Sequence, residues 1–192
     1  MKRGLIIVAT VWILLLGGCR TAFDVSESVA ETYQTDIEAT VRVSTLTGVP
    51  CDYRLHCVTN TTETVTEILE PASVAGIKAI IESDTCRIEY EEILLDSMML
   101  PVPGMTPADC FDQTIRGIRK EIPQRYSYEK RNEIECLCLT FSQEVAGYQA
   151  TRVVWLDAKS LELLEGEYYL NHVMVMRMMV ESFAFTNTPA VE

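Results

Sequence analysis

The chain has 192 residues, of which 28 are acidic and 16 basic, and its formal net charge is −12. This charge argues against a nucleic-acid partner, which needs clustered Lys and Arg, and the 48% hydrophobic content is too high for a disordered chain. Only two histidines are present, which disfavours most His-based catalytic and metal sites, and the length fits one domain with a short appendage.

The first 18 residues have the pattern of a signal peptide. Residues 1–3 carry two positive charges, and residues 4–16 carry none. A spanning helix needs about 20 apolar residues, so this shorter run is typical of an export signal. The tetrapeptide at positions 16–19, Leu-Gly-Gly-Cys, resembles the lipobox of bacterial lipoproteins. That resemblance implies cleavage between Gly18 and Cys19 and a covalent diacylglycerol and acyl anchor, such as palmitate, on Cys19.

These features predict a signal peptide at 1–18, a lipidated tether at 19–25 and a single domain at 26–192. Each buried methylene contributes about 0.8 kcal/mol, and two acyl chains suffice for stable anchoring. We therefore expect attachment to the extracytoplasmic face of the bacterial cell membrane through lipid. The alternative is an ordinary signal peptide, or a short signal anchor, with an incidental cysteine.

Six further cysteines permit disulfides in an exported protein, with 15 pairings open. Cys51 and Cys57 lie in one predicted strand, about 20 Å apart, beyond the ~7 Å limit for a disulfide. Cys136 and Cys138 point to one face about 7 Å apart, and no histidine stands at ligand spacing, so zinc is not expected. Buried free thiols are favoured, with no metal site and no cofactor besides the anchor. The six are Cys51, Cys57, Cys86, Cys110, Cys136 and Cys138.

The first half of the domain predicts a helix at 27–34 and then a five-stranded meander. Apolar and polar residues alternate in the strands, as in a sheet with one wet face, and the short turns imply antiparallel pairing. The absence of βαβ alternation and of a phosphate-binding glycine loop argues against dinucleotide and nucleoside triphosphate binding. The predicted strands are 37–44, 51–57, 62–70, 76–82 and 86–94.

An amphipathic helix is predicted at 107–120. Thr106 is the expected N-cap with Pro107 at the first helical position, and Pro123 ends the segment. Three or four strands follow, at 133–143, 149–157, 161–170 and 173–185. The order of strands, helix and strands predicts an α+β fold, in which one curved antiparallel sheet carries one or two helices on its concave face.

The last predicted strand is apolar on both faces and rich in methionine. Methionine fills irregular gaps in cores and also suits surfaces that accept variable apolar shapes. Two interpretations stay open: core packing under the helix, or the lining of an apolar pocket. The candidate pocket residues are Phe111, Ile115 and Ile118 from the helix and Met174, Met176 and Met178 from the strand.

No catalytic set is evident, because a nucleophile and base require a Ser or Cys near a His that is oriented by a carboxylate. His56 lies on the wet side of its strand and His172 lies in a hairpin turn, so both are expected to face solvent. The carboxylates scatter along the strands without pairing across a cleft. We therefore expect no enzymatic activity and no catalytic residues.

Residues 66–79 resemble a segment of LolA-like proteins in which a strand is followed by Pro, four residues, Gly and a further strand. Leu156-Asp157 and residues 161–167 resemble the later hairpin of that family, and the resemblance covers residues 33–185. Among lipobox-bearing members, the chain is most similar to small Firmicutes lipoproteins related to the germination lipoprotein GerS.

This resemblance implies a LolA/LolB-like half-barrel, an incomplete barrel with an apolar interior and without catalytic residues. Its relatives include lipoprotein carriers, envelope stress sensors and GerS-type regulators of a cell-wall amidase. An anchor on Cys19 disfavours shuttling, so two mechanisms compete. Either the concave face binds a lipid or acyl group, or a strand edge docks a partner such as an amidase or a second copy. The alternative class is a thiol- or metal-dependent redox lipoprotein that uses Cys136 and Cys138.

Overall fold

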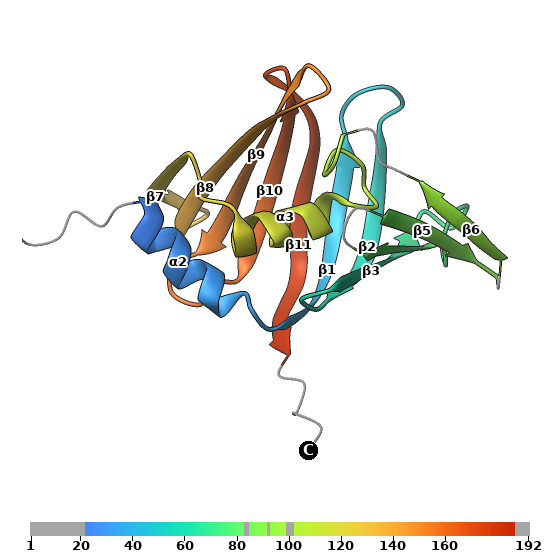
Figure 1. Cartoon of the computed structure of the whole chain (residues 1–192), viewed down its shortest axis with the longest axis horizontal. Helices are drawn as coiled ribbons and strands as arrows, with labels where there is room; N and C mark the ends of the chain where they lie inside the picture. The colour runs from blue at the N-terminus through green and yellow to red at the C-terminus, as the bar shows by residue number, and fades with distance from the viewer. Residues whose placement is uncertain (1–21, 83–84, 92, 99–101, 187–192) are drawn as a thin grey trace, which may run out of the picture.

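The computed structural model describes residues 22–82, 85–91, 93–98 and 102–186. The predicted signal peptide, the cleavage site and Cys19 lie outside these residues. Within them, eleven strands form one antiparallel sheet in the order β6-β5-β4-β3-β2-β1-β11-β10-β9-β8-β7 (Figure 1). The first six are β1 Asp36–Thr45, β2 Cys51–Thr59, β3 Glu63–Glu70, β4 Lys78–Glu82, β5 Thr85–Tyr90 and β6 Ile93–Met98.

The other five strands follow the second helix: β7 Arg125–Arg131, β8 Ile134–Val145, β9 Tyr148–Asp157, β10 Leu163–Leu170 and β11 Val173–Thr186. Each half of the sheet is a meander of neighbouring strands. The two halves meet where β1 pairs with β11, from Asp36 opposite Thr186 to Thr45 opposite Met176. Among the described residues, the sheet keeps two free edges, β6 and β7.

The period-two pattern of the sequence explains which side of the sheet is buried. In β1, the side chains of Ile37, Ala39, Val41 and Val43 are all buried, whereas the residues between them are not. A register shift lies between Thr40 and Val41, where β1 pairs with β11. Apolar side chains on one side of a sheet need a covering layer, which the two helices supply.

The helices are α2 Ala22–Thr32 and α3 Cys110–Lys120. In Figure 1, α3 lies across the concave side of the central strands, and α2 covers the end of the sheet toward β7. The buried residues of α3 and of the central strands form one hydrophobic core, to which α2 adds Val25 and Val29. The predicted α+β class, with a curved antiparallel sheet and helices on its concave face, is therefore confirmed.

The start of α3 differs from the prediction. The helix begins at Cys110, and Asp109 occupies the N-cap position in place of Thr106. The carboxylate of Asp109 is buried and accepts hydrogen bonds from the backbone N–H of Gly104 at 2.6 Å and from the hydroxyl of Thr106 at 2.6 Å. Because these bonds close the preceding loop on itself, residues 107–109 stay outside the regular helix.

Three other predictions of elements were wrong. The first helix spans Ala22–Thr32 and not 27–34, so it begins within the predicted tether. The strand predicted at 86–94 is two strands, because Glu91 adopts a positive φ of 48° between Tyr90 and Ile93. Strand β7 was not predicted, because this exposed edge strand lacks an apolar face.

No helix in the part of the chain described by the structure is long and apolar enough to span a membrane.

Candidate functional site

Five of the six predicted pocket residues pack together in the core. Phe111, Ile115 and Ile118 of α3 belong to the same buried cluster as Met176 and Met178 of β11, and none of these five side chains is more than 2% exposed. Met174 is half-buried. The side chains of α3 and β11 therefore fill the space between helix and sheet, and a role for them in ligand binding stays a prediction.

Two buried arginines fix α3 to the sheet and to the α2–β1 link. Arg152 of β9 donates hydrogen bonds to the backbone carbonyl of Gln113 and, at 2.7 Å, to the carboxylate of Glu121. Arg119 of α3 donates to the carbonyls of Tyr33 at 2.7 Å and Thr35 at 2.8 Å. Because these hydrogen bonds tie α3 to β9 and to the α2–β1 link, they hold the helix in place.

Strands β4–β6 form an arm that projects beyond the end of α3 (Figure 1). Ala79, Ile81 and Cys86 form a small buried cluster on the concave side of this arm, and Ile88 and Ala108 pack against it. The cluster is separate from the core under α3. The segment before α3, which contains Ala108, therefore covers only part of the arm.

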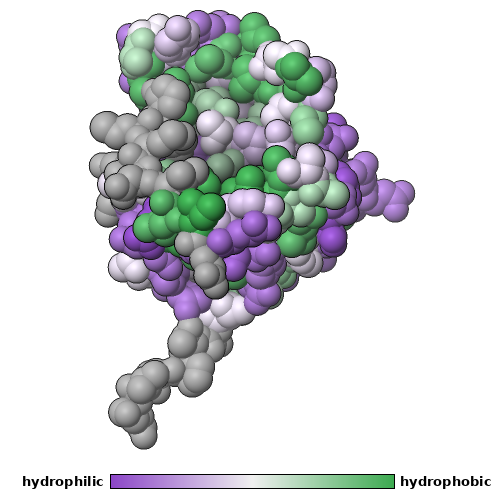
Figure 2. Space-filling model, turned by 90° about the vertical axis from the view of Figure 1, so that its right-hand side faces the viewer, coloured by the Kyte–Doolittle hydropathy of each residue, from purple (hydrophilic) through white to green (hydrophobic). Residues whose placement is uncertain are grey.

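The apolar side of the arm continues from this buried cluster to exposed side chains. Cys86, Ile88 and Tyr90 share one side of β5 because side chains alternate along a strand, and Ile93 lies opposite Tyr90 across the β5–β6 pair. Tyr90 is 41% exposed and Ile93 is 60% exposed. Figure 2, which faces this end of the molecule, shows hydrophobic residues gathered there. We call the following set the arm surface: Ala79, Ile81, Cys86, Ile88, Tyr90 and Ile93.

The two histidines are not placed for catalysis. His56 is half-exposed and its Nε2 lies 3.0 Å from a carboxylate oxygen of Glu38, and His172 is exposed in a turn with a φ of 67°. The prediction that both face solvent is confirmed. Neither is joined to a Ser or Cys by a hydrogen bond in the described part of the chain.

Cys136 and Cys138 lie on one face of β8, in a small cluster with Trp155. Burial raises the pKa of both thiols, that of Cys138 to about 11. All six cysteines in the described ranges are free thiols, and these ranges contain no group of three His, Cys, Asp or Glu side chains that could hold a metal ion. This environment favours the protonated thiol and opposes nucleophilic chemistry.

The arm surface and the two buried arginines were hardly predictable from sequence. Residues 86–94 were predicted as one strand, which conceals the turn that brings Ile93 opposite Tyr90. Gly117 was the available signal for Arg152, because a glycine inside a helix indicates close approach of another group. The guanidinium of Arg152 lies against this glycine.

No protein-family model and no curated protein sequence matches this chain. Among solved structures, an uncharacterized conserved protein from Thermus thermophilus is similar with a TM-score of 0.56 and 12% identity, over 88% of this chain and 90% of that one. A DUF1329 family protein from Desulfovibrio piger gives 0.53 and 11%, over 89% and 93%. A LolA superfamily protein from Nitrosomonas europaea gives 0.41 and 12%, over 85% and 94%. At these identities the likeness concerns the fold alone.

Proposed function

We propose that this chain is a membrane-anchored lipoprotein without enzymatic activity, whose half-barrel domain binds an acyl chain of a lipid or lipoprotein on the arm surface. The observation that carries the proposal is the continuity of this surface. It runs from buried Ile81 and Cys86 to Tyr90 and Ile93, which are exposed beyond the end of α3. An apolar surface that leads outward from a core is a suitable path for a flexible hydrocarbon chain.

Hydrocarbon burial supplies enough free energy for this role. Each buried methylene contributes about 0.8 kcal/mol, so about ten methylenes on the arm surface would contribute about 8 kcal/mol before the entropic cost of association. Five of the six predicted pocket residues lie in the separate core under α3. Phe111 and Met178 would contact the ligand only after α3 had moved away from the sheet.

The binding test uses the chain from residue 20 onward and a fluorescent fatty acid. Ile93→Glu places a charge on the exposed end of the arm surface, and we expect it to weaken binding at least tenfold, because an acyl chain cannot solvate a buried carboxylate. Val173→Glu is the matched control, since Val173 is 58% exposed and lies at the start of β11, outside the arm. Absence of fatty-acid binding by the unaltered chain, or equal weakening by both variants, would refute the proposal.

The anchor is proposed to be the acylated Cys19 that remains after cleavage at Gly18. The charge and length pattern of residues 1–19 supports it, as does the acidic composition, since an acidic body is repelled by an anionic membrane and needs lipid for attachment. Labelled palmitate should be incorporated into the full chain in a bacterial host and not into a Cys19→Ser variant. Equal labelling of both chains would contradict this assignment.

A second candidate function is regulation of an envelope protein, such as a cell-wall amidase, in a role like that of GerS in germination. The observation that favours a protein partner is the edge of β6, which is free among the described residues and lies next to exposed Ile93 and Leu94. Such an edge can pair with a strand of another protein or of a second copy of this chain. A pull-down with the full chain would support this function if an amidase were retained by the unaltered chain and lost from Ile93→Glu.

A further inference from the structure

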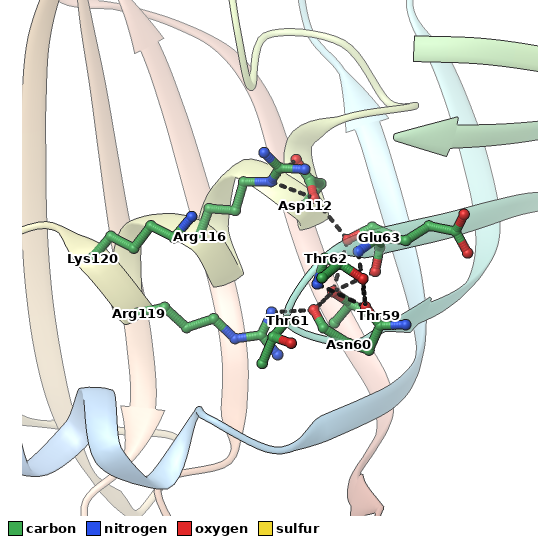
Figure 3. A pocket seen from close by; sticks show the side chains of 10 residues that line it. Thr59, Asn60, Thr61, Thr62, Glu63, Asp112, Arg116, Arg119 and Lys120 are labelled. Carbon is green, nitrogen blue, oxygen red and sulfur yellow. Dashed lines mark hydrogen bonds and ion pairs between the residues drawn. The ribbon is translucent and has the colours of Figure 1, made fainter. Parts of the chain in front are cut away.

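A polar cavity of about 160 Å³ lies between α3 and the β2–β3 turn. Figure 3 shows that Arg116, Arg119 and Lys120 of α3 frame one side of it, and that Thr61 and Thr62 of the turn frame the other. The cavity is separate from the arm surface in its residues and in its chemistry. Three cations around one small space stand out in a chain whose net charge is −12.

Two of these cations, Arg119 and Lys120, form no ion pair in the described ranges, although the charges of Asp112 and Asp36 act on Arg119 from farther away. Arg116 forms an ion pair with Asp112 at 2.8 Å. Arg119, by contrast, donates to three backbone carbonyls, including that of Asn60, and forms no ion pair in these ranges. A guanidinium has five N–H donors, so two of those on Arg119 remain available. Burial costs a charge much of its solvation, and an anion in the cavity would restore it.

Lys120 is the second cation that forms no ion pair in the described ranges. Its side chain is exposed at the end of α3 and no described residue accepts a hydrogen bond from it. Two acidic residues also line the cavity. Asp112 is paired with Arg116, and Glu63 on the opposite wall extends its carboxylate away from the cations in Figure 3. Thr61 adds a hydroxyl without a partner among the described residues, so the cavity offers both charge and hydrogen-bond donors.

The volume limits the ligand. At about 30 Å³ per water molecule, a cavity of about 160 Å³ holds about five waters. A tetrahedral oxyanion with its first waters fits this space, whereas a whole nucleotide or lipid does not. The ligand must therefore be a small ion or the terminal group of a larger molecule that stays outside.

We infer that this cavity is a binding site for a phosphate group, held by the guanidinium of Arg119, the ammonium of Lys120 and the hydroxyl of Thr61. Charge-assisted hydrogen bonds from Arg and Lys are the strongest that proteins offer to phosphate. The phosphate is either free or the terminal monoester of a lipid headgroup. The site does not depend on acyl binding at the arm surface.

The test uses the full chain in phosphatidylcholine nanodiscs, titrated with inorganic phosphate by calorimetry at low ionic strength. We expect saturable binding that weakens with added salt. Lys120→Gln should weaken it about tenfold, the loss of one hydrogen bond to a charged group. The matched control is Lys159→Gln, an exposed lysine in the β9–β10 turn away from this cavity, which should leave binding unchanged. Because Lys120 is exposed, the variant should fold normally, which its melting temperature checks.

A second measurement distinguishes free phosphate from the phosphate of a lipid headgroup. Soluble dihexanoyl phosphatidic acid should compete with inorganic phosphate, and tighter binding than phosphate would identify a lipid headgroup as the ligand. Weaker binding would identify free phosphate. Absence of saturable phosphate binding, or the same affinity in Lys120→Gln and Lys159→Gln, would overturn the inference whatever the result for fatty acids.

Discussion

A β-carbon at position 117 would lie 3.1 Å from Nη2 of Arg152, closer than ordinary van der Waals contact. Gly117 therefore makes room for the guanidinium that joins β9 to α3 through Gln113 and Glu121. Its cost is conformational, because glycine inside a helix is about 1 kcal/mol less favourable than alanine. The packing of one buried arginine explains why the helix keeps a residue that disfavours it.

This arrangement predicts that the effect of Gly117→Ala on the free energy of unfolding has opposite signs with and without Arg152. Alone, Gly117→Ala should destabilise the protein by about 1 kcal/mol, because the guanidinium must shift from its hydrogen bonds. In an Arg152→Met background it should stabilise by about 1 kcal/mol, because only helix propensity remains. Urea unfolding of the four proteins of this double-mutant cycle measures both values. Equal effects of Gly117→Ala in the two backgrounds would show that the contact does not constrain the helix.

The thiols provide a prediction that bears on the redox alternative. Burial raises the pKa of Cys57 to about 12 and that of Cys138 to about 11. Since the thiolate is the reactive form, a pKa of about 11 leaves about one Cys138 thiol in a thousand ionised at pH 8. Alkylation of the native protein should therefore modify half-exposed Cys51 first and leave Cys57 and Cys138 intact.

Mass spectrometry after alkylation at pH 8 checks this order, and the urea-unfolded protein, in which every thiol should react, is the control. The rates at Cys138 should rise with pH up to about 11, in keeping with the direction of its pKa. Rapid modification of Cys136 and Cys138 in the native protein would favour the thiol-dependent alternative over the binding function.

At the scale of elements, hydrophobic periodicity predicted the helices and strands that have one buried face. Helix α3 was recognised because Phe111, Ile115 and Ile118 recur at helical spacing, and the central strands were recognised because they alternate. Strand β7 was not predicted because most of its side chains are exposed. It is held by backbone pairing with β8, and backbone pairing alone leaves no periodic pattern in the sequence. The arm surface was not predicted either, because it depends on a turn at Glu91 that the alternating pattern does not reveal.

The arm should open more readily than the centre of the sheet. Among the described residues its buried cluster consists of Ala79, Ile81 and Cys86, with Ile88 and Ala108 beside it, whereas β1 and β11 belong to the main core. Regions with few buried apolar contacts open locally below the global unfolding free energy. Amide hydrogen exchange should be faster in β4 and β5 than in β1 and β11. Ile81→Ala should increase this difference in exchange rate. Equal protection throughout would show that the sheet opens only as a whole.

At the scale of the whole molecule, two buried arginines and one apolar core hold a helix inside an open sheet. Both edges of the sheet are free among the described residues, yet they differ in chemistry. The β7 edge carries exposed Arg125 and Lys130, which oppose strand pairing with other chains, while the β6 edge adjoins exposed Ile93 and Leu94. The chain thus protects one edge with charge and leaves apolar side chains beside the other.

The pairing of β1 with β11 also sets the order in which the molecule can be completed. In chain order β1 is the first strand and β11 the last, so the first meander lacks its neighbouring strand until β11 has been synthesised. Contacts between segments so far apart in sequence form slowly. We therefore expect a chain without β11 to form two separate sheets, because β11 is the strand that joins the two meanders into one.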